Sequence, residues 1–440
     1  MHKADTADTP SLRYAWFVVA LLMLAYVFSF VDRQIVGMLV KPMRADLGIS
    51  DTQVSLLGGI SFALFYCICG IPLGRLADRG NRVRLVAAGV FAWSFATALC
   101  GLSRQYWQLF MARIGVGVGE AALSPAAYSL ISDYFPPDRR ATAISVYSMG
   151  IYVGSGIAFL LGGLAIKLAY EYGPLDLPLV GLLRPWQTVF LVLGVTGAAF
   201  SVLFLVIREP QRKGAVGAPV PLREALAWFR LNRRTVLCHN IGFAMLSMAS
   251  YASAFWIPAF FERIHGWGIA RLALVYGSIV LVFGPAGIVF GGWLADRWGR
   301  AGVTDATMRV GLMAAVACVP FGALFPLMPT PELASIALAP AVFALAMPFG
   351  VAASGVQDIM PNRLRGQASA VYLFIVNLIG LGCGPTAVAL VTDYVFHDDA
   401  AVRWSLMIVG GIAQAAAIAL LWSGLAPYRA SIVRLRALAA

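Results

Sequence analysis

The sequence predicts an all-α membrane protein in which twelve transmembrane helices form two pseudo-symmetric six-helix bundles. Three observations lead to this fold class. First, 60% of the 440 residues are hydrophobic and only 12% are charged, which excludes an ordinary soluble domain. Second, the apolar residues fall into twelve runs, each near the roughly 20 residues that a helix needs to cross a bilayer. Third, short motifs of the first half of the chain return in the second half.

The twelve apolar runs are separated by charged residues or by Gly and Pro. In the first half of the chain the expected spans are 14–37, 52–74, 85–103, 105–132, 141–165 and 187–207. In the second half they are 236–261, 271–295, 307–328, 333–357, 366–392 and 404–426. Spans of this length leave only short loops, so we expect no appended soluble domain that could carry out catalysis.

The longest charged segment lies between the sixth and seventh spans and is rich in Gly and Pro. We therefore expect an N-terminal six-helix bundle over 1–207, a linker over 208–234 and a C-terminal six-helix bundle over 235–440. Within the linker, residues 222–231 have the pattern of a short amphipathic helix.

The net charge of +12 arises from 33 Lys and Arg against 21 Asp and Glu. Such a balance can indicate nucleic-acid binding, but these charges lie in short loops between apolar runs, so no nucleic-acid partner is expected. If the N-terminus is cytoplasmic, the loops on that side hold 23 Lys and Arg and the opposite loops hold eight. This imbalance predicts that both termini are cytoplasmic. The compact loops and short tails are typical of a bacterial protein, so we expect the inner membrane.

Motifs of enzymes and of metal sites are missing from the apolar runs. All six cysteines lie in apolar stretches without Cys-x-x-Cys spacing, so we expect no metal and no cofactor. Neither HExxH, GxSxG nor the phosphate-binding GxxxxGK[ST] occurs, which disfavours an enzyme and a nucleotide-driven pump.

An internal repeat supports the two bundles. The stretch 74–79, Gly-Arg-Leu-Ala-Asp-Arg, returns at 292–297 as Gly-Trp-Leu-Ala-Asp-Arg, an offset of 218 residues. A second match has an offset of 225: Asp133, Pro136, Arg140 and Tyr147 are answered by Asp358, Pro361, Arg365 and Tyr372. Two independent matches at nearly one offset indicate a duplication, with a pseudo-two-fold axis along the membrane normal.

The repeated stretch resembles the signature loop of the major facilitator superfamily, GxLADRxGR, which follows the second and eighth of twelve spans. This resemblance implies transport by alternating access, with a cavity between the halves near the bilayer midplane. It also implies a gate built from the loop residues; the alternative is simple loop anchoring. The gating residues we predict are Asp78, Arg79, Arg82, Asp133, Arg140, Asp296, Arg297, Arg300, Asp358 and Arg365.

Three ionisable residues lie within the first and fourth spans: Asp32, Arg113 and Glu120. A charge at the centre of a membrane helix costs about 2.5–3.5 kcal/mol on insertion scales, so it needs a partner or a function. Arg113 and Glu120 are two helical turns apart and can share a face. We predict that all three bind substrate and that Asp32 and Glu120 accept protons.

The glycines between Arg113 and Glu120 would allow a neighbouring helix to approach, and we expect the first span to come close enough for Asp32 to reach Arg113. Two carboxylates beside one Arg leave an uncompensated charge in a dry site, so we expect at least one to hold a proton. Arg33 follows Asp32 directly and is expected to point elsewhere. The alternative is an ion-pair cluster that only stabilises the N-terminal half, against which the matching positions of the C-terminal half carry no such charges.

The C-terminal half offers an aromatic, mostly uncharged lining. Phe243, Tyr251 and Asn377 are the residues that we predict to bind substrate there, although any single residue of this kind is more often ordinary helix packing. Glycine-rich faces at 150–163 and 380–384 are expected to act as packing hinges between the halves.

Residues 20–165 resemble the Spinster family of sphingolipid and lysolipid transporters. Four strings carry this resemblance: Phe-Val-Asp-Arg at 30–33, Arg113 with Gly-Val-Gly-Glu-Ala at 117–121, Val-Gly-Ser-Gly at 153–156 and, most tellingly, Asp-Arg-Gly-Asn-Arg at 78–82. It implies proton-linked or facilitated movement of sphingosine 1-phosphate or a lysophospholipid, and functional roles for Asp32, Arg113 and Glu120.

The sequence therefore predicts a secondary active transporter that works by alternating access, is coupled to protons and moves an amphipathic anionic lipid. The alternative is a proton-coupled symporter of a small organic anion or sugar acid. A membrane receptor or scaffold without transport is a third interpretation, disfavoured because no extramembrane module is evident. We expect the protein to work as a monomer among membrane lipids.

Overall fold

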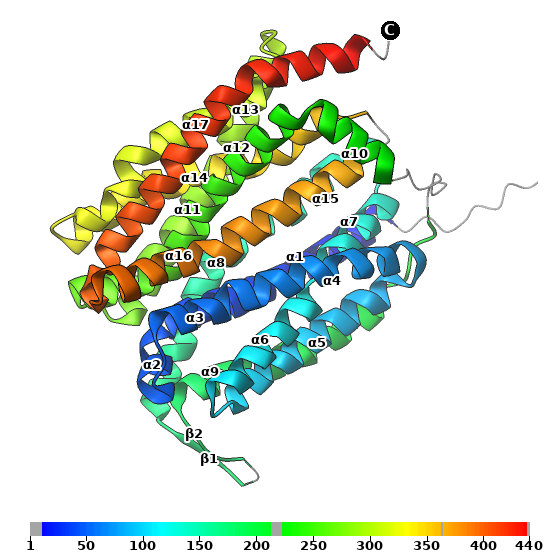
Figure 1. Ribbon diagram of the computed structural model, residues 1–440. Helices are drawn as coiled ribbons and strands as arrows, with labels where there is room; N and C mark the ends of the chain where they lie inside the picture. Colours follow the sequence, from blue (N-terminus) through cyan, green and yellow to red (C-terminus); the bar gives the residue numbers. More distant parts are fainter. Residues whose placement is uncertain (1–10, 179, 213–221, 362–363, 438–440) are drawn as a thin grey trace, which may run out of the picture.

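The computed structural model describes residues 11–178, 180–212, 222–361 and 364–437 (Figure 1). Within these residues, twelve helical spans are long and apolar enough to cross a membrane. Each coincides with one of the twelve expected apolar runs, so the predicted fold class is confirmed. The fifth and twelfth spans extend further than the apolar pattern predicts, to Tyr172 and Ala437, because these helices continue through polar residues beyond the apolar run.

Seven spans are built on one long helix each: α1 (Leu12–Met38), α5 (Arg82–Leu102), α8 (Pro137–Tyr172), α11 (Arg233–His265), α12 (Ile269–Arg300), α14 (Pro331–Asp358) and α17 (Val402–Ala437). The other five are interrupted: α3 (Asp51–Gly58) with α4 (Ile60–Arg79), α6 (Tyr106–Glu120) with α7 (Leu123–Tyr134), α9 (Pro185–Ser201) with η1 (Val202–Val206), α13 (Ala306–Cys318) with η2 (Val319–Ala323) and η3 (Phe325–Leu327), and α15 (Arg365–Val376) with η5 (Asn377–Cys383), α16 (Gly384–Leu390) and η6 (Val391–Phe396).

The two ends of the molecule carry different short elements (Figure 1). We call one end the terminal face, because α17 ends there beside the linker helix α10 (Leu222–Leu231). The other end, the hairpin face, carries α2 (Val40–Leu47) and the antiparallel strands β1 (Leu175–Leu177) and β2 (Gly181–Leu183). The amphipathic helix expected at 222–231 is present as α10. The division at 208–234 stays a prediction, since residues 213–221 lie outside the described part.

The two bundles contact each other where the second and eleventh spans are both interrupted. At Gly59, between α3 and α4, an added Cβ would lie 2.8 Å from the backbone oxygen of Gly382 in η5. Such a close approach of two backbones requires glycine. Thr386 supports the same turn by donating a hydrogen bond to Gly382 O at 3.3 Å.

A second contact between the bundles joins α8 to α12. A Cβ added to Gly156 of α8 would lie 2.8 Å from Leu281, and one added to Gly284 of α12 would lie 2.2 Å from the ring of Tyr152. The glycine-rich face of the fifth span therefore contacts α12, and that of the eleventh span contacts α4 and α11. These small-residue contacts place the bundles within backbone distance along two seams.

Replacement of Gly156 by Ala should loosen the seam between α8 and α12. The new methyl group would meet Leu281, and overpacking of this kind costs about 1–3 kcal/mol. We expect a lower melting temperature of the purified protein in detergent. The matched control is Gly410→Ala in α17, where the added Cβ meets no atom within 4 Å and should not lower the melting temperature. A Gly156→Ala protein as stable as the control would contradict the tight seam.

Candidate functional site

The centre of the N-terminal bundle holds an ion pair between α1 and α6. The Glu120 carboxylate accepts hydrogen bonds from Arg33 Nε at 2.8 Å and from Ser29 Oγ at 2.6 Å, and Arg33 Nη2 lies 2.7 Å from the same oxygen. Ser29 and Arg33 are four residues apart in α1, so they share the face that meets Glu120. Glu120 is buried, while 10% of the Arg33 side chain is exposed. We call Arg33 and Glu120 the central pair.

Aromatic rings surround the guanidinium of Arg33. Its Cζ lies 4.7 Å from the ring centre of Phe62, 5.1 Å from that of Tyr66 and 5.2 Å from that of Phe30. Ring faces attract a cation and offset part of the cost of removing it from water. Arg33 is therefore held at membrane depth without a full shell of hydrogen-bond acceptors.

Arg113 lies deeper in the same bundle and is fully buried. It donates hydrogen bonds to the backbone oxygens of Leu57 at 3.1 Å and Asp32 at 3.3 Å. Its Nη2 has no hydrogen-bond partner in the described structure, nor has Oε1 of Glu120. These contacts hold the junctions of α1, α3 and α6 together from inside the bundle.

Two predicted contacts of this cluster are wrong. No ion pair joins the Asp32 carboxylate to Arg113 in the described structure; the contact runs through the Asp32 backbone oxygen instead. Arg33, expected to point away, is the partner of Glu120. With Arg33 included, two acids accompany two cations, so charge balance alone no longer demands a bound proton.

The glycines of α6 also have neighbours other than the expected ones. A Cβ on Gly117 would lie 2.7 Å from the Phe62 backbone oxygen of α4, and one on Gly119 would lie 2.5 Å from Trp93 N of α5. The glycine run therefore brings α4 and α5 close to α6, rather than α1. This places the Phe62 ring, in turn, against both arginines.

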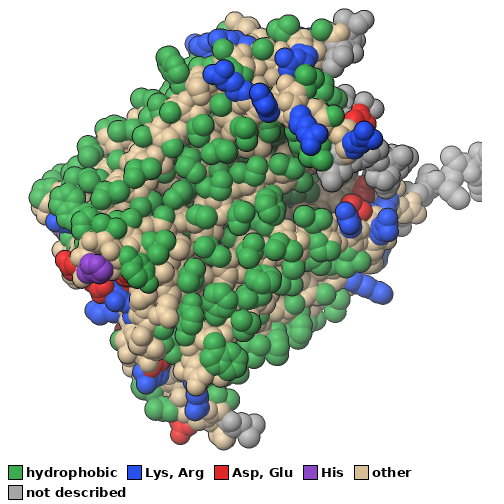
Figure 2. All heavy atoms as spheres, viewed as in Figure 1, with side chains coloured by type: hydrophobic (Ala, Val, Ile, Leu, Met, Phe, Trp, Pro, Cys, Tyr) green, Lys and Arg blue, Asp and Glu red, His purple; other side chains and the backbone are tan. Residues whose placement is uncertain are grey.

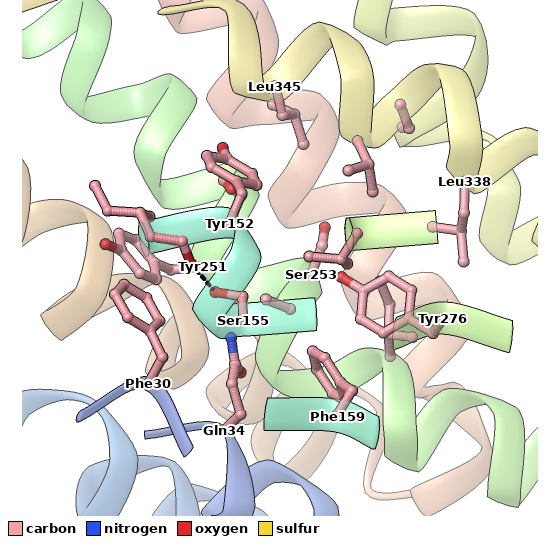
Figure 3. A pocket seen from close by; sticks show the side chains of 18 of the residues that line it. Phe30, Gln34, Tyr152, Ser155, Phe159, Tyr251, Ser253, Tyr276, Leu338 and Leu345 are labelled. Carbon is pink, nitrogen blue, oxygen red and sulfur yellow. Dashed lines mark hydrogen bonds between the residues drawn. The ribbon is translucent and has the colours of Figure 1, made fainter. Parts of the chain in front are cut away.

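A narrow apolar pocket lies between the two bundles, with about 60 Å³ open to the centres of water-sized molecules (Figure 3). Phe30 of α1 and Tyr152 and Phe159 of α8 line it from the N-terminal bundle, and Tyr251 of α11 and Tyr276 of α12 line it from the C-terminal bundle. Its few polar groups are mainly the hydroxyls of serines and tyrosines together with the side chain of Gln34. Phe30 lines the pocket and its ring centre lies 5.2 Å from Arg33 Cζ, so one side chain separates the central pair from the pocket.

The residues predicted to bind substrate from the C-terminal half lie in different places. Tyr251 lines the pocket. Phe243 is buried in the C-terminal bundle, where a Cβ on Gly311 would meet its ring, and Asn377 lies half-buried at the start of η5. Neither Phe243 nor Asn377 lines this pocket.

A group of ion pairs that the sequence analysis missed joins the bundles at the hairpin face. Asp51 is fully buried; its two oxygens accept from Arg263 of α11 at 2.5 and 2.7 Å, and Arg44 of α2 lies 3.1 Å away. Arg44 also reaches Asp399 at 2.5 Å. We call Arg44, Asp51, Arg263 and Asp399 the hairpin-face latch, because two members come from each bundle.

Local sequence signals position this latch. Gly48 ends α2 in the left-handed conformation at φ 63°, and Ser50 caps α3 in a reciprocal capping box with Gln53. Asp51 is thereby the first residue of α3, where the helix dipole favours a carboxylate. Gly48 and the spacing of Ser50 and Gln53 could have identified the two caps from the sequence. Nothing in the sequence indicates that Arg263, 212 residues away, is the partner of Asp51.

The electrostatics of the latch keep its cations charged. Burial alone lowers the pKa of Arg44, but the hydrogen bond to Asp399 and the charge of Asp51 outweigh burial, so the pKa of Arg44 lies above its ordinary value. Thr52 adds a further link between bundles, since its N and Oγ1 both donate to Asp393 at 2.7 Å. The hairpin face is therefore closed by charge-assisted hydrogen bonds.

The residues predicted to gate the terminal face are arranged differently. Asp78, Arg79, Asp296 and Arg297 are exposed, and none forms an ion pair in the described part of the chain. Arg82 is fully buried and pairs with Asp133, and with Glu209 at 2.6 Å, all within the N-terminal bundle and its exit.

The remaining predicted gating residues make contacts within the C-terminal bundle or lie at the terminal face. Tyr428 OH donates to Asp358 at 3.4 Å, and Arg300 donates to the backbone oxygen of Asp296 at 3.3 Å. Arg365 is exposed at the start of α15, and Arg140 is half-buried in the first turn of α8. Within the described residues, neither of these two hydrogen bonds crosses from one bundle to the other.

Comparison with known proteins identifies the family. The Major Facilitator Superfamily pattern matches residues 22–385, so the chain belongs to this superfamily of membrane transporters. A crystal structure of a bacterial homologue of the human lysosomal transporter Spinster, inward-facing and unoccupied, superposes with a TM-score of 0.76 at 25% identity, covering 96% of this chain and 98% of that one. The chain is a multi-pass integral membrane protein that resembles bacterial Spinster proteins.

Curated relatives differ in what they are described to carry. An MFS-type efflux pump of Mycolicibacterium smegmatis is 29% identical over 98% of this chain and 97% of the pump. A probable L-galactonate transporter of Escherichia coli is 23% identical over 91% of this chain and 87% of its own length. The sphingosine-1-phosphate transporter SPNS2 of Danio rerio is 25% identical over 62% of this chain, and the match spans about half of that longer protein (55%).

Removal of the buried carboxylate of the latch should open the hairpin face. Asp51→Asn leaves Arg44 and Arg263 without their shared acceptor, and breaking a buried pair in this way costs about 3–5 kcal/mol. We expect faster hydrogen–deuterium exchange of residues 41–52 in the purified protein.

The control for this measurement is Asp176→Asn, which removes an exposed carboxylate from β1 on the same face. Exchange in that variant should match the wild type. Unchanged exchange in Asp51→Asn, with both proteins folded, would show that the latch does not hold this face closed.

Proposed function

We propose that this chain is a secondary active transporter that moves an amphipathic anionic lipid, such as a lysophospholipid or sphingosine 1-phosphate, together with protons by alternating access. The observation that carries the proposal is the position of Arg33, which only the Phe30 ring separates from an apolar pocket between the two bundles. An anionic head would bind the guanidinium, and an acyl chain would occupy the pocket. Arg113, which is fully buried and bonded to backbone oxygens, would position α1 and α3 rather than touch the head.

Competition for Arg33 supports proton coupling. In the described state the cation is occupied by Glu120. An anionic head that takes Arg33 would leave the Glu120 carboxylate buried without its counter-charge, and a carboxylate in that position binds a proton. Substrate and proton would then be bound together, which predicts that both move in the same direction. Asp32, also buried, is a second candidate proton acceptor.

The closed latch supports assigning this conformation to the inward-facing state of a bacterial inner-membrane protein with cytoplasmic termini. In that orientation the terminal face, rich in Lys and Arg, is cytoplasmic. We propose that Asp78, Arg79, Asp296 and Arg297 pair across the bundles when the terminal face closes and the latch opens. The protein would do so as a monomer, without nucleic acid or cofactor.

A small organic anion or sugar acid is the second candidate substrate. It is favoured by the hydroxyls of Ser155, Ser253 and Tyr276 in the pocket, which could bind a polyol. The resemblance to an L-galactonate transporter supports it as well. Such a substrate would use Arg33 for its carboxylate and leave the apolar part of the pocket unfilled.

Transport should depend on both members of the central pair, in different ways. Arg33→Gln removes the binding site of the head and should reduce uptake of labelled lysophospholipid into proteoliposomes by about tenfold or more. Glu120→Gln leaves Arg33 free without a proton, so flux should persist but lose its dependence on a pH gradient. Asp32→Asn is measured in parallel.

The matched control is Arg104→Gln, at an exposed arginine of the hairpin face, which should transport as the wild type does. If Arg33→Gln transports normally, the head does not bind there. If Glu120→Gln stays gradient-dependent, the carboxylate is not the coupling group.

Filling the pocket should separate the two substrate classes. Leu345 lines the pocket from α14 (Figure 3), and Leu345→Trp would occupy the volume proposed for the acyl chain. We expect at least about a tenfold loss of lysophospholipid uptake, since a buried chain of a few methylenes contributes about 0.8 kcal/mol each. Leu345→Ala, which enlarges the pocket, should retain uptake. Equal loss for a hexuronate and a lipid, or transport of the hexuronate alone by the wild type, would favour the second candidate.

A further inference from the structure

The linker helix α10 exposes one continuous face that combines basic and apolar side chains. Arg223, Leu226, Ala227, Arg230 and Leu231 are all exposed, with 44% of Leu226 and 56% of Leu231 accessible. Their spacing of 3, 4, 7 and 8 residues places them on one side of the helix. We call these five residues the α10 face.

The opposite side of α10 is fixed to the C-terminal bundle. Trp228 Nε1 donates to the backbone oxygen of Ile359 at 3.0 Å, and Trp228 and Phe229 pack against the core of this bundle. Asn232, which is buried, accepts from Arg434 of α17 at 2.6 Å. The α10 face therefore keeps a fixed orientation relative to the C-terminal bundle.

The surroundings of α10 are cationic and lie at the edge of the apolar belt. Arg233 and Arg234 follow α10 directly and are exposed. In Figure 2 hydrophobic side chains cover the middle of the visible face, and Lys and Arg side chains gather at the end where Figure 1 shows α10 and the end of α17. The acid of the helix, Glu224, is half-buried. The end of the molecule that carries α10 therefore lies at the level where the headgroups of a bilayer would surround the protein.

We propose that the α10 face binds anionic phospholipid headgroups of the surrounding leaflet. Leu226 and Leu231 would enter the boundary of the acyl chains, while Arg223 and Arg230 reach phosphates on either side, as long basic side chains do at membrane interfaces. Arg233 and Arg234 add to the attraction of an anionic surface. A soluble acidic partner would leave the two exposed leucines without an apolar contact, which is why we assign a lipid surface.

This binding site has a mechanical consequence that does not depend on which substrate is carried. Because hydrogen bonds and packing hold α10 on the C-terminal bundle, lipid binding would anchor that bundle at the leaflet while the N-terminal bundle moves against it. The anchoring would depend on the anionic lipid content of the membrane and weaken at high salt.

The test compares hydrogen–deuterium exchange of the full chain in nanodiscs of phosphatidylcholine with and without phosphatidylglycerol. We expect the amides of 222–231 to exchange about tenfold more slowly when phosphatidylglycerol is present. Arg223→Gln/Arg230→Gln should abolish this slowing, and Arg223→Lys/Arg230→Lys should retain it. The matched control, Lys167→Gln/Arg271→Gln, removes two exposed cations from the hairpin face and should leave the slowing intact.

Three outcomes would overturn the proposal. Equal exchange of the wild type in both lipids would show that the face does not bind anionic headgroups. Slowing that survives Arg223→Gln/Arg230→Gln would place the lipid elsewhere, and slowing lost equally in the hairpin-face control would make it an effect of net charge. A helix that unfolds in the Gln variant is recognised by faster exchange in phosphatidylcholine alone, and the Lys variant then decides between the site and its absence.

Discussion

The arrangement of this protein depends on one constraint: a cation buried at membrane depth must keep a counter-charge or other polar partners. Arg33 satisfies it with Glu120 and with the faces of three aromatic rings. Because only the Phe30 ring separates this guanidinium from the pocket between the bundles, an anion that reached Arg33 would compete directly with Glu120. An anion and a carboxylate that share one cation are coupled by charge balance alone, without a conformational signal between separate sites.

The same constraint explains why the two ends of the molecule differ. At the hairpin face Asp51 is buried between two arginines, so separation of the bundles there would expose or isolate several charges at once. At the terminal face the charged residues of the repeated motif are exposed and solvated, and their separation costs little. Glycine contacts at Gly59 and Gly156 lie between these ends and allow the two bundles to approach each other within backbone distance.

The sequence predicted the fold well because span length and apolar composition are local properties. It identified the charged residues of the first and fourth spans, but it paired them wrongly. The rotation of α1 about its axis decides whether Asp32 or Arg33 faces α6, and an apolar run contains no signal for that rotation. The latch was missed for a related reason: Asp51, Arg263 and Asp399 are ordinary loop-edge charges in the sequence, and only the packing of the bundles brings them together. The amphipathic α10, by contrast, was predicted because its pattern is complete within ten residues.

The duplication that produced the two bundles leaves them unequal in chemistry. The central pair belongs to the N-terminal bundle, whereas the C-terminal bundle contributes mainly aromatic and aliphatic side chains to the pocket. A substrate held between them would therefore be oriented, with its charge toward α1 and α6 and its apolar part toward α12 and α14. Rocking of the bundles would expose both parts to one side of the membrane and then to the other. An amphiphile would fill the apolar lining that both bundles contribute, while a fully polar solute would leave most of that lining without a partner, and this is the physical reason for preferring the lipid.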